Sequence, residues 1–149
     1  MPRRHSRRGT TNTRRCLGNQ MVKFEDALDV SPQDDGHNWL VLEDFYYDTD
    51  VVLSGLNSNQ VVVEKGFVTD FASIPRPLWA IVGAPADGKY RKIAVVHDKL
   101  YRTRGLATRA EADAVLLEGM KFSGVGWFSR SLIYAGVRAG GRSSYKGGM

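Results

Sequence analysis

The stretch KYRKIAVVHDKLY, residues 89–101, decides how the rest of the chain is interpreted. Its apolar residues recur at intervals of three and four, which predicts an amphipathic helix over Gly88–Thr103, ended by Gly105. His97 lies on the apolar face of that helix, and Asp98 is turned about 100° from it, toward the edge of the face. Polar residues in an apolar stripe need partners, and these have to come from another part of the chain.

A second helix is predicted over Thr108–Phe122, because Thr108 and Glu111 have the spacing of a capping box. Asp113 in this helix is followed at i+3, i+4 and i+7 by apolar residues, so it lies on the stripe that faces the core. The link RTRGLA between the two helices is short, which favours antiparallel packing. This packing places Asp113 within reach of His97.

A carboxylate buried at Asp113 requires a hydrogen-bond donor, and the candidates are His97, Tyr101 and a nearby arginine. If His97 is the partner, one ring nitrogen is fixed and the other is free to take a proton from water. Asp98 is then placed to hold a hard cation that polarises a substrate oxygen. The alternative is that the pair only fixes the register of the two helices, and periodicity alone does not separate the two cases.

The half of the chain before these helices is rich in strand-forming residues. Strands are predicted at Trp39–Asp48, Val51–Leu53 and Gln60–Val68, separated by turn-forming residues. The segment TDFASIPRPLWAIVGAPADG follows, and its prolines exclude a regular element, so we expect an irregular connection that packs across the core. A third amphipathic helix is predicted over Trp127–Arg138. The expected fold class is α+β, a small antiparallel sheet packed against two or three helices.

The formal net charge of +5 comes from the start of the chain. Residues 1–20 contain no acidic residue and six arginines, namely Arg3, Arg4, Arg7, Arg8, Arg14 and Arg15, and without those six charges residues 21–149 carry −1. We expect residues 1–20 to be a disordered basic tail, either a nucleic-acid-binding arm or an extension ahead of a start at Met21. Residues 21–149 are expected to form a single domain whose end, from about residue 139, is flexible.

The cysteine count and the absence of common motifs exclude several classes of protein. Cys16 is the only cysteine, so disulfides within the chain and cysteine metal sites are not expected. No apolar run reaches the ~20 residues that a transmembrane helix needs. A chain with so little cysteine is typical of a protein made in a reducing cytoplasm. Glycine-rich phosphate-binding motifs are absent, and His37 and His97 are too few for a histidine zinc centre.

Four blocks, GFVTDFASIPRPLW, AVVHDKLY, EADAVLLEGMKFSGV and YAGVRAGG, resemble in order the signature blocks of a phage and prophage family, domain of unknown function 1353. The resemblance covers nearly all of the chain from Met21. It implies a bacteriophage protein of the host cytoplasm during infection, or of the virion, with other phage proteins or a host envelope component as partners. It implies no established activity.

The motif H-D-x-x-Y at His97, with an aspartate on the next helix, is similar to that of the secreted phospholipases A-two and of a parvoviral capsid domain. By that resemblance His97 is the water-activating base, Asp98 a calcium ligand, Asp113 the acid that orients the histidine, and Tyr101 a supporting hydroxyl. Asp70 supplies a further calcium ligand if the proline-containing segment folds over the helix pair. The glycine-rich calcium loop and the disulfides of those enzymes have no counterpart here.

Three functions stay open. The first is a phage accessory protein with a His97/Asp98/Asp113 site, acting as a metal-assisted hydrolase on a host envelope component. The second is a non-enzymatic virion or assembly component in which these residues brace the helices. The third is a nucleic-acid-associated protein that binds through its arginine-rich tail. We favour the first, because three polar groups converging on one helix interface exceed what bracing requires.

Overall fold

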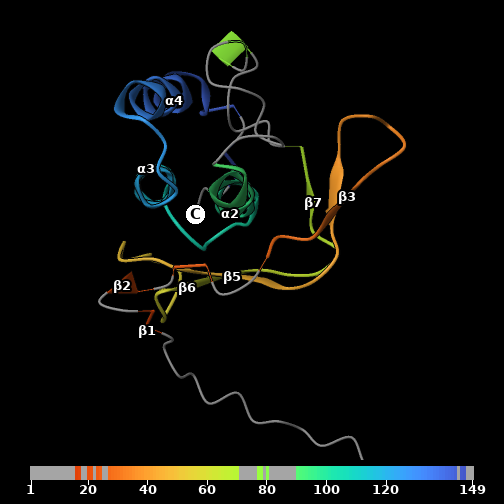
Figure 1. The fold of residues 1–149 in the computed structure, drawn as a ribbon, viewed down its shortest axis with the longest axis horizontal. Helices are drawn as coiled ribbons and strands as arrows, with labels where there is room; N and C mark the ends of the chain where they lie inside the picture. The colour runs from red at the N-terminus through yellow and green to blue at the C-terminus, as the bar shows by residue number, and fades with distance from the viewer. Residues whose placement is uncertain are drawn as a thin grey trace, which may run out of the picture.

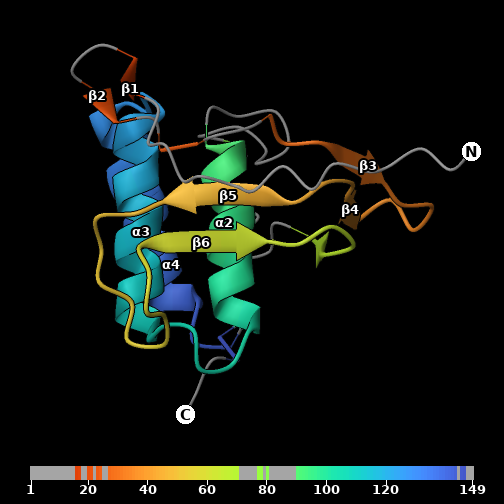
Figure 2. The same cartoon turned by 90° about the horizontal axis from the view of Figure 1, so that it is seen from below.

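The computed structural model describes residues 16–17, 20–21, 23–24, 27–70, 77–78, 80, 90–143 and 145–146. They form the α+β fold that the sequence predicts, arranged in layers (Figures 1 and 2). Strands β5 (Phe45–Asp48) and β6 (Gln60–Val63) lie on one side of helices α2 (Arg91–Arg102) and α3 (Arg109–Phe122). Helix α4 (Trp127–Gly140) packs on the opposite side of α3.

The described strands pair antiparallel throughout and form three small sheets. Strand β4 (Trp39–Val41) is central in the first sheet, between β3 (Val30–Pro32) and β7 (Val68–Thr69). Strands β5 and β6 form the second sheet, over four residue pairs. Strands β1 (Cys16–Leu17) and β2 (Gln20–Met21) form the third. The structure thus divides the expected sheet into several short ones.

The predicted strand Trp39–Asp48 is wrong in its middle, because the chain bends between β4 and β5. The amide of Leu42 donates to the carbonyl of Asp29 at 2.9 Å, and the carboxylate of Asp44 accepts from the amide of Lys65 at 2.8 Å. These two bonds tie the bend to other parts of the chain. Strands β4 and β5 consequently belong to different sheets.

The other two strand predictions are also corrected. Residues Val51–Leu53 form no strand, and the amide of Val51 donates locally to the hydroxyl of Thr49 at 3.0 Å. The predicted strand Gln60–Val68 divides into β6 and β7 around Gly66, whose φ of 88° ends the extended run. Glycine adopts that left-handed conformation without the steric cost other residues meet.

The helical half follows the prediction closely. Helix α3 begins with the expected capping box, in which Thr108 and Glu111 satisfy each other's backbone amides. Helix α4 extends to Gly140, two residues beyond its predicted end. The sequence predicts a flexible chain end from about residue 139. Within that end, the hydroxyl of Tyr145 donates to the carbonyl of Ala107 at 2.7 Å.

Within the described part of the chain, no helix is both long and apolar enough to cross a membrane.

The core lies between the β5–β6 sheet and the helices. Alternate residues of the two strands point inward, so Phe45, Tyr47, Val61 and Val63 are at most 1% exposed. They join the apolar face of α2 in one buried cluster, to which Ile93, Val96 and Leu100 belong. This packing fixes the rotation of α2 about its axis, and with it the direction in which His97 points.

A half-buried carboxylate ties the β5–β6 sheet to α3. Glu118 accepts hydrogen bonds from the hydroxyls of Tyr47 at 2.7 Å and Thr49 at 2.9 Å. Its other oxygen accepts from the amide of Asp50 at 3.0 Å and pairs with Lys23 at 3.3 Å. Burial and the bond to Glu118 raise the pKa of Tyr47, which keeps its hydroxyl protonated as the donor.

The contact between α2 and α3 predicts the cost of one substitution. A Cβ at Gly119 would lie 2.7 Å from the Cβ of Ile93, which is fully buried and has no room to move. Gly119→Ala should therefore lower the free energy of unfolding by about 1–3 kcal/mol, although alanine favours a helix by about 1 kcal/mol. Denaturant unfolding measures this difference.

Gly126→Ala is the matched control, because a Cβ there meets nothing within 4 Å. Gly126→Ala should lower the free energy of unfolding by less than about 1 kcal/mol, because alanine is a poorer N-cap residue than glycine. A Gly119→Ala protein as stable as the wild type would show that α2 and α3 are not packed this closely.

Candidate functional site

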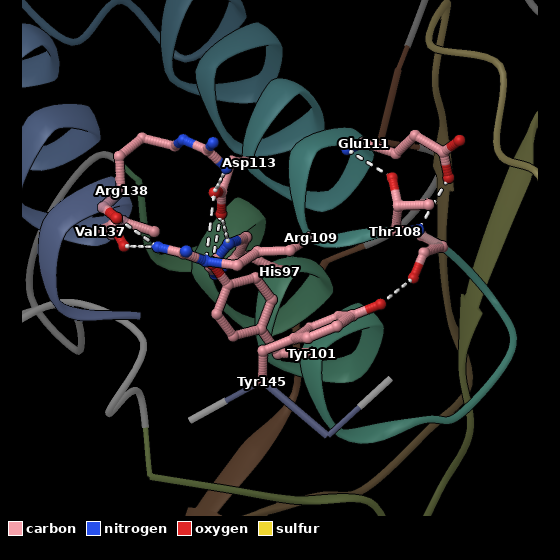
Figure 3. A network of polar contacts seen from close by, with 10 residues as sticks. His97, Tyr101, Thr108, Arg109, Glu111, Asp113, Val137, Arg138 and Tyr145 are labelled. Carbon is pink, nitrogen blue, oxygen red and sulfur yellow. Dashed lines mark hydrogen bonds and ion pairs between the residues drawn. The ribbon is translucent and has the colours of Figure 1, made fainter. Parts of the chain in front are cut away.

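The structure brings His97 of α2 and Asp113 of α3 into direct contact. The His97 Nε2 atom lies 2.9 Å from Asp113 Oδ1, and both side chains are fully buried (Figure 3). Both residues lie on the apolar stripes that the sequence assigns to the two helices. The expected meeting of the imidazole and the distant carboxylate is therefore present in the fold.

Asp113 is the centre of a larger network. The Tyr101 hydroxyl donates to the same Oδ1 atom at 2.5 Å, and Arg138 Nη1 donates to Oδ2 at 2.8 Å. Figure 3 shows these side chains converging on Asp113 from α2 and α4. Arg109 Nε lies 4.0 Å from Oδ2, and the Nη2 atom of Arg109 donates to the carbonyls of Val137 and Arg138. One carboxylate thus receives donors from two neighbouring helices.

The network fixes the charge of Asp113. Burial on its own would raise the pKa of this carboxyl, but hydrogen bonds from His97, Tyr101 and Arg138 outweigh burial and lower it. The carboxylate is therefore ionised at neutral pH and can only accept hydrogen bonds. Burial first, and then the bond to Asp113, raises the pKa of Tyr101, so its hydroxyl stays protonated and donates.

An ionised Asp113 also determines the tautomer of His97. Because the carboxylate accepts from Nε2–H, a neutral imidazole carries its lone pair on Nδ1. The Nδ1 atom is buried and has no hydrogen-bond partner in the structure as described. Leaving a buried polar atom unpaired costs about 1–3 kcal/mol. Arg109 Nε is the other buried atom of the network without a hydrogen-bond partner in the described structure, and it is a donor, so Nδ1 is the one of the two that can accept a proton.

Arg102 links the carboxylates of Asp98 and Asp70. Arg102 Nε pairs with Asp98 Oδ1 at 2.9 Å, and Arg102 Nη2 binds the carboxylate of Asp70. The second oxygen of Asp98 accepts from the Thr69 hydroxyl at 2.7 Å. Burial raises the pKa of Asp98, even though Thr69 and Arg102 both act to lower it.

These residues do not fit a calcium ion. Calcium takes six to eight oxygen ligands, and the guanidinium of Arg102 already binds the two carboxylates predicted as ligands, Asp98 and Asp70. The described residues contain no group of three or more His, Cys, Asp or Glu side chains that would hold a metal ion.

The six tail arginines lie outside the described residues, as does most of the proline-containing segment. The sequence does not mark two further members of the network, Arg138 and Arg109, as site residues. The sequence predicts a nearby arginine as a partner for Asp113. Arg109 precedes Asp113 by four residues, a spacing that places the two side chains side by side on a helix. Arg138 lies 25 residues away on another helix, so no local pattern marks it.

The fold and the network define a small α+β protein with a buried histidine–carboxylate pair between two helices. The chain belongs to the family described as "Protein of unknown function (DUF1353)", whose model matches residues 39–137. It is 35% identical over 74 residues to the "Uncharacterized protein y4jT" of Sinorhizobium fredii (strain NBRC 101917 / NGR234). That alignment covers 49% of this chain and 22% of the relative, so the chain spans less than a quarter of the relative's length. No solved structure matches the chain.

The two buried aspartates should change the pH dependence of stability in opposite directions. The folded pKa of Asp113 is lowered, so its contribution is present above the unfolded pKa of about 4 and is lost as the pH falls through the folded pKa. The folded pKa of Asp98 is raised, so its contribution is present at low pH and is lost as the pH rises through the folded pKa.

The free energy of unfolding, measured from about pH 3 to about pH 7, should therefore rise less steeply in Asp113→Asn than in the wild type, and more steeply in Asp98→Asn. Each unit of pKa difference between the folded and unfolded states corresponds to about 1.4 kcal/mol. Each variant serves as the control for the other. A change of slope in the same direction for both would contradict the assigned networks.

Proposed function

We propose that the protein is a hydrolase in which His97 activates water, encoded by a phage or prophage and acting on an ester of the host cell envelope. The observation that carries the proposal is the pairing of His97 Nε2 with Asp113 at 2.9 Å while Nδ1 keeps no partner in the described structure. A histidine held by a carboxylate on one nitrogen and open on the other has the arrangement of a general base.

The proposed reaction follows from the tautomer. A water molecule gives a proton to His97 Nδ1 while its oxygen attacks the ester carbonyl. The imidazolium that forms is stabilised by the ionised Asp113. As the tetrahedral intermediate collapses, the proton passes from Nδ1 to the leaving oxygen, and the products are a carboxylic acid and an alcohol. General-base assistance of this kind typically contributes about 10²–10⁴-fold in rate.

Tyr101 and Arg138 have positioning roles in this scheme. Both donate to Asp113 and hold its carboxylate against His97. Arg109 links this network to an open space, because it lines a cavity of about 190 Å³ together with Ser54, Thr108 and Tyr145. His97 itself is fully buried, so the reaction requires an opening that brings water and the ester to Nδ1.

The burial of His97 favours a second candidate function, a non-enzymatic virion or assembly component. In that case the Asp113 network only braces α2, α3 and α4 against one another. His97, Tyr101 and Asp113 are each fully buried, as expected of a brace. The unpaired Nδ1 atom is the observation that a brace leaves unexplained, because a purely structural histidine gains nothing from an unsatisfied nitrogen.

His97→Gln separates the two functions. The glutamine amide still donates to Asp113 and has a similar volume, so the free energy of unfolding should change by less than about 2 kcal/mol. Release of fatty acid from mixed micelles of phosphatidylethanolamine and phosphatidylglycerol should fall at least about 100-fold, because the amide cannot act as a base. Fatty-acid release and denaturant unfolding are measured on the same preparations.

His37→Gln is the control, because His37 is exposed on the turn between β3 and β4. It should leave both activity and stability at the wild-type level. No release of fatty acid by the wild-type protein would count against the proposed envelope hydrolase. A loss of stability in His97→Gln without any activity to lose would favour the brace.

A further inference from the structure

Three large aromatic side chains are exposed within seven residues of the chain, where α3 ends and α4 begins. Phe122 is 44% exposed, Trp127 71% and Phe128 64%. We call these three residues the aromatic tip. No other aromatic residue of the described chain is exposed to this degree. Exposed aromatic groups gathered at one place indicate an interaction surface rather than the scattered apolar exposure of any protein surface.

The backbone that carries the aromatic tip is fixed. Val125, between the two helices, is only 7% exposed, and its amide donates to the carbonyl of Met120 at 3.0 Å. Gly124 has a φ of 74°, and its amide donates to the carbonyl of Lys121 at 3.2 Å. The turn is thus anchored by a buried residue and by hydrogen bonds. The aromatic rings are presented by a defined backbone, which lowers the entropy lost when they dock.

The chain that carries the aromatic tip is basic. Residues 119–149 contain five basic residues and no acidic one, whereas residues 21–118 contain 10 basic and 16 acidic residues. Lys121 and Arg130 flank the aromatic residues in the chain, and neither α2 nor α4 has an acidic residue in its first turn. Figure 2 shows α2 and α4 beginning at the same end of the helical layer, so the positive ends of both helix dipoles lie there.

The nearest acid before the aromatic tip along the chain is held by hydrogen bonds. Glu118 lies four residues before Phe122, and it accepts hydrogen bonds from Tyr47 and Thr49. Lys23 pairs with the same carboxylate at 3.3 Å. Lys23 also pairs with Asp50, at 2.6 Å. These contacts hold the Glu118 carboxylate toward the β5–β6 sheet.

We propose that the aromatic tip docks the protein on an anionic lipid surface. Tryptophan and phenylalanine side chains insert at the boundary between headgroups and acyl chains, and neighbouring cations are attracted by anionic lipids. A second copy of the chain is a less suitable partner. In a two-fold interface the same surface of both copies meets, so Lys121 and Arg130 of one copy would face Lys121 and Arg130 of the other and repel them. The tip is separate from His97, so docking does not depend on the proposed hydrolysis.

The full-length protein is tested on vesicles of equal parts phosphatidylglycerol and phosphatidylcholine, with brominated acyl chains that quench nearby tryptophan fluorescence. Trp127 should be quenched in the wild type, and Trp127→Phe should remove that quenching while binding changes less than about threefold, because phenylalanine still inserts. The other two tryptophans of the chain are present in both proteins and serve as the internal reference.

The variant W127S/F128S should bind these vesicles about tenfold or more weakly, since two apolar side chains no longer leave water. Val52→Ser is the matched control, because Val52 is 78% exposed but lies near the link between α2 and α3, and it should bind within about twofold of the wild type. All variants carry the same arginine-rich tail, so its electrostatic attraction to the vesicles is constant.

Binding with no quenching of Trp127 would assign the attraction to the tail and overturn the proposal. Equal binding of W127S/F128S and the wild type would also overturn it. Sedimentation without lipid tests whether a second copy of the chain covers the tip instead. If the wild type is a dimer and W127S/F128S is a monomer, the tip is a contact between copies and the proposal fails. None of these measurements uses turnover, so their failure is distinct from a failure of the proposed hydrolase.

Discussion

The packing of the three helices depends on a buried negative charge. A carboxylate taken out of water costs several kcal/mol unless donors surround it. Asp113 meets this requirement with donors from His97, Tyr101 and Arg138, which come from the helices on either side of α3. Each helix therefore has to sit at one rotation and one register. The same constraint that fixes the helices also fixes the imidazole, so the stability of the fold and the geometry of the candidate site have one cause.

Two buried aspartates, 15 residues apart in the chain, are satisfied in different ways. Asp113 takes neutral and cationic donors and has a lowered pKa, whereas burial raises the pKa of Asp98 despite its bonds to Thr69 and Arg102. Arg102 supplies at Asp98 the positive charge that a metal ion would otherwise supply. The local motif alone suggested a calcium ligand at this position. The partner that changes this interpretation is a side chain one helical turn later, so the neighbours of a motif decide its chemistry.

The parts of the fold that follow from local rules were predictable from the sequence. The helices follow from apolar periodicity and a capping box, and the contact of His97 with Asp113 follows from two apolar stripes joined by a short link. The bend that separates β4 from β5 was not predictable, because it depends on Asp44 binding a backbone amide 21 residues later. Arg138 reaches Asp113 across 25 residues. Such contacts depend on the tertiary fold, and no short window of sequence contains them.

The exposure of the aromatic tip has a structural cause of its own. The buried residues of α4 are Ile133 and Val137, and Gly126 gives its first turn no side-chain cap. Trp127 precedes Ile133, the first buried residue of α4, by six residues, which is about 9 Å along the helix axis. The first turn of α4 contains no buried residue, although Val125 just before it is buried, and this turn carries two large apolar side chains. Exposed apolar area of this size is unfavourable in water, and contact with an apolar surface relieves it, which supports the proposed docking of this end of the molecule.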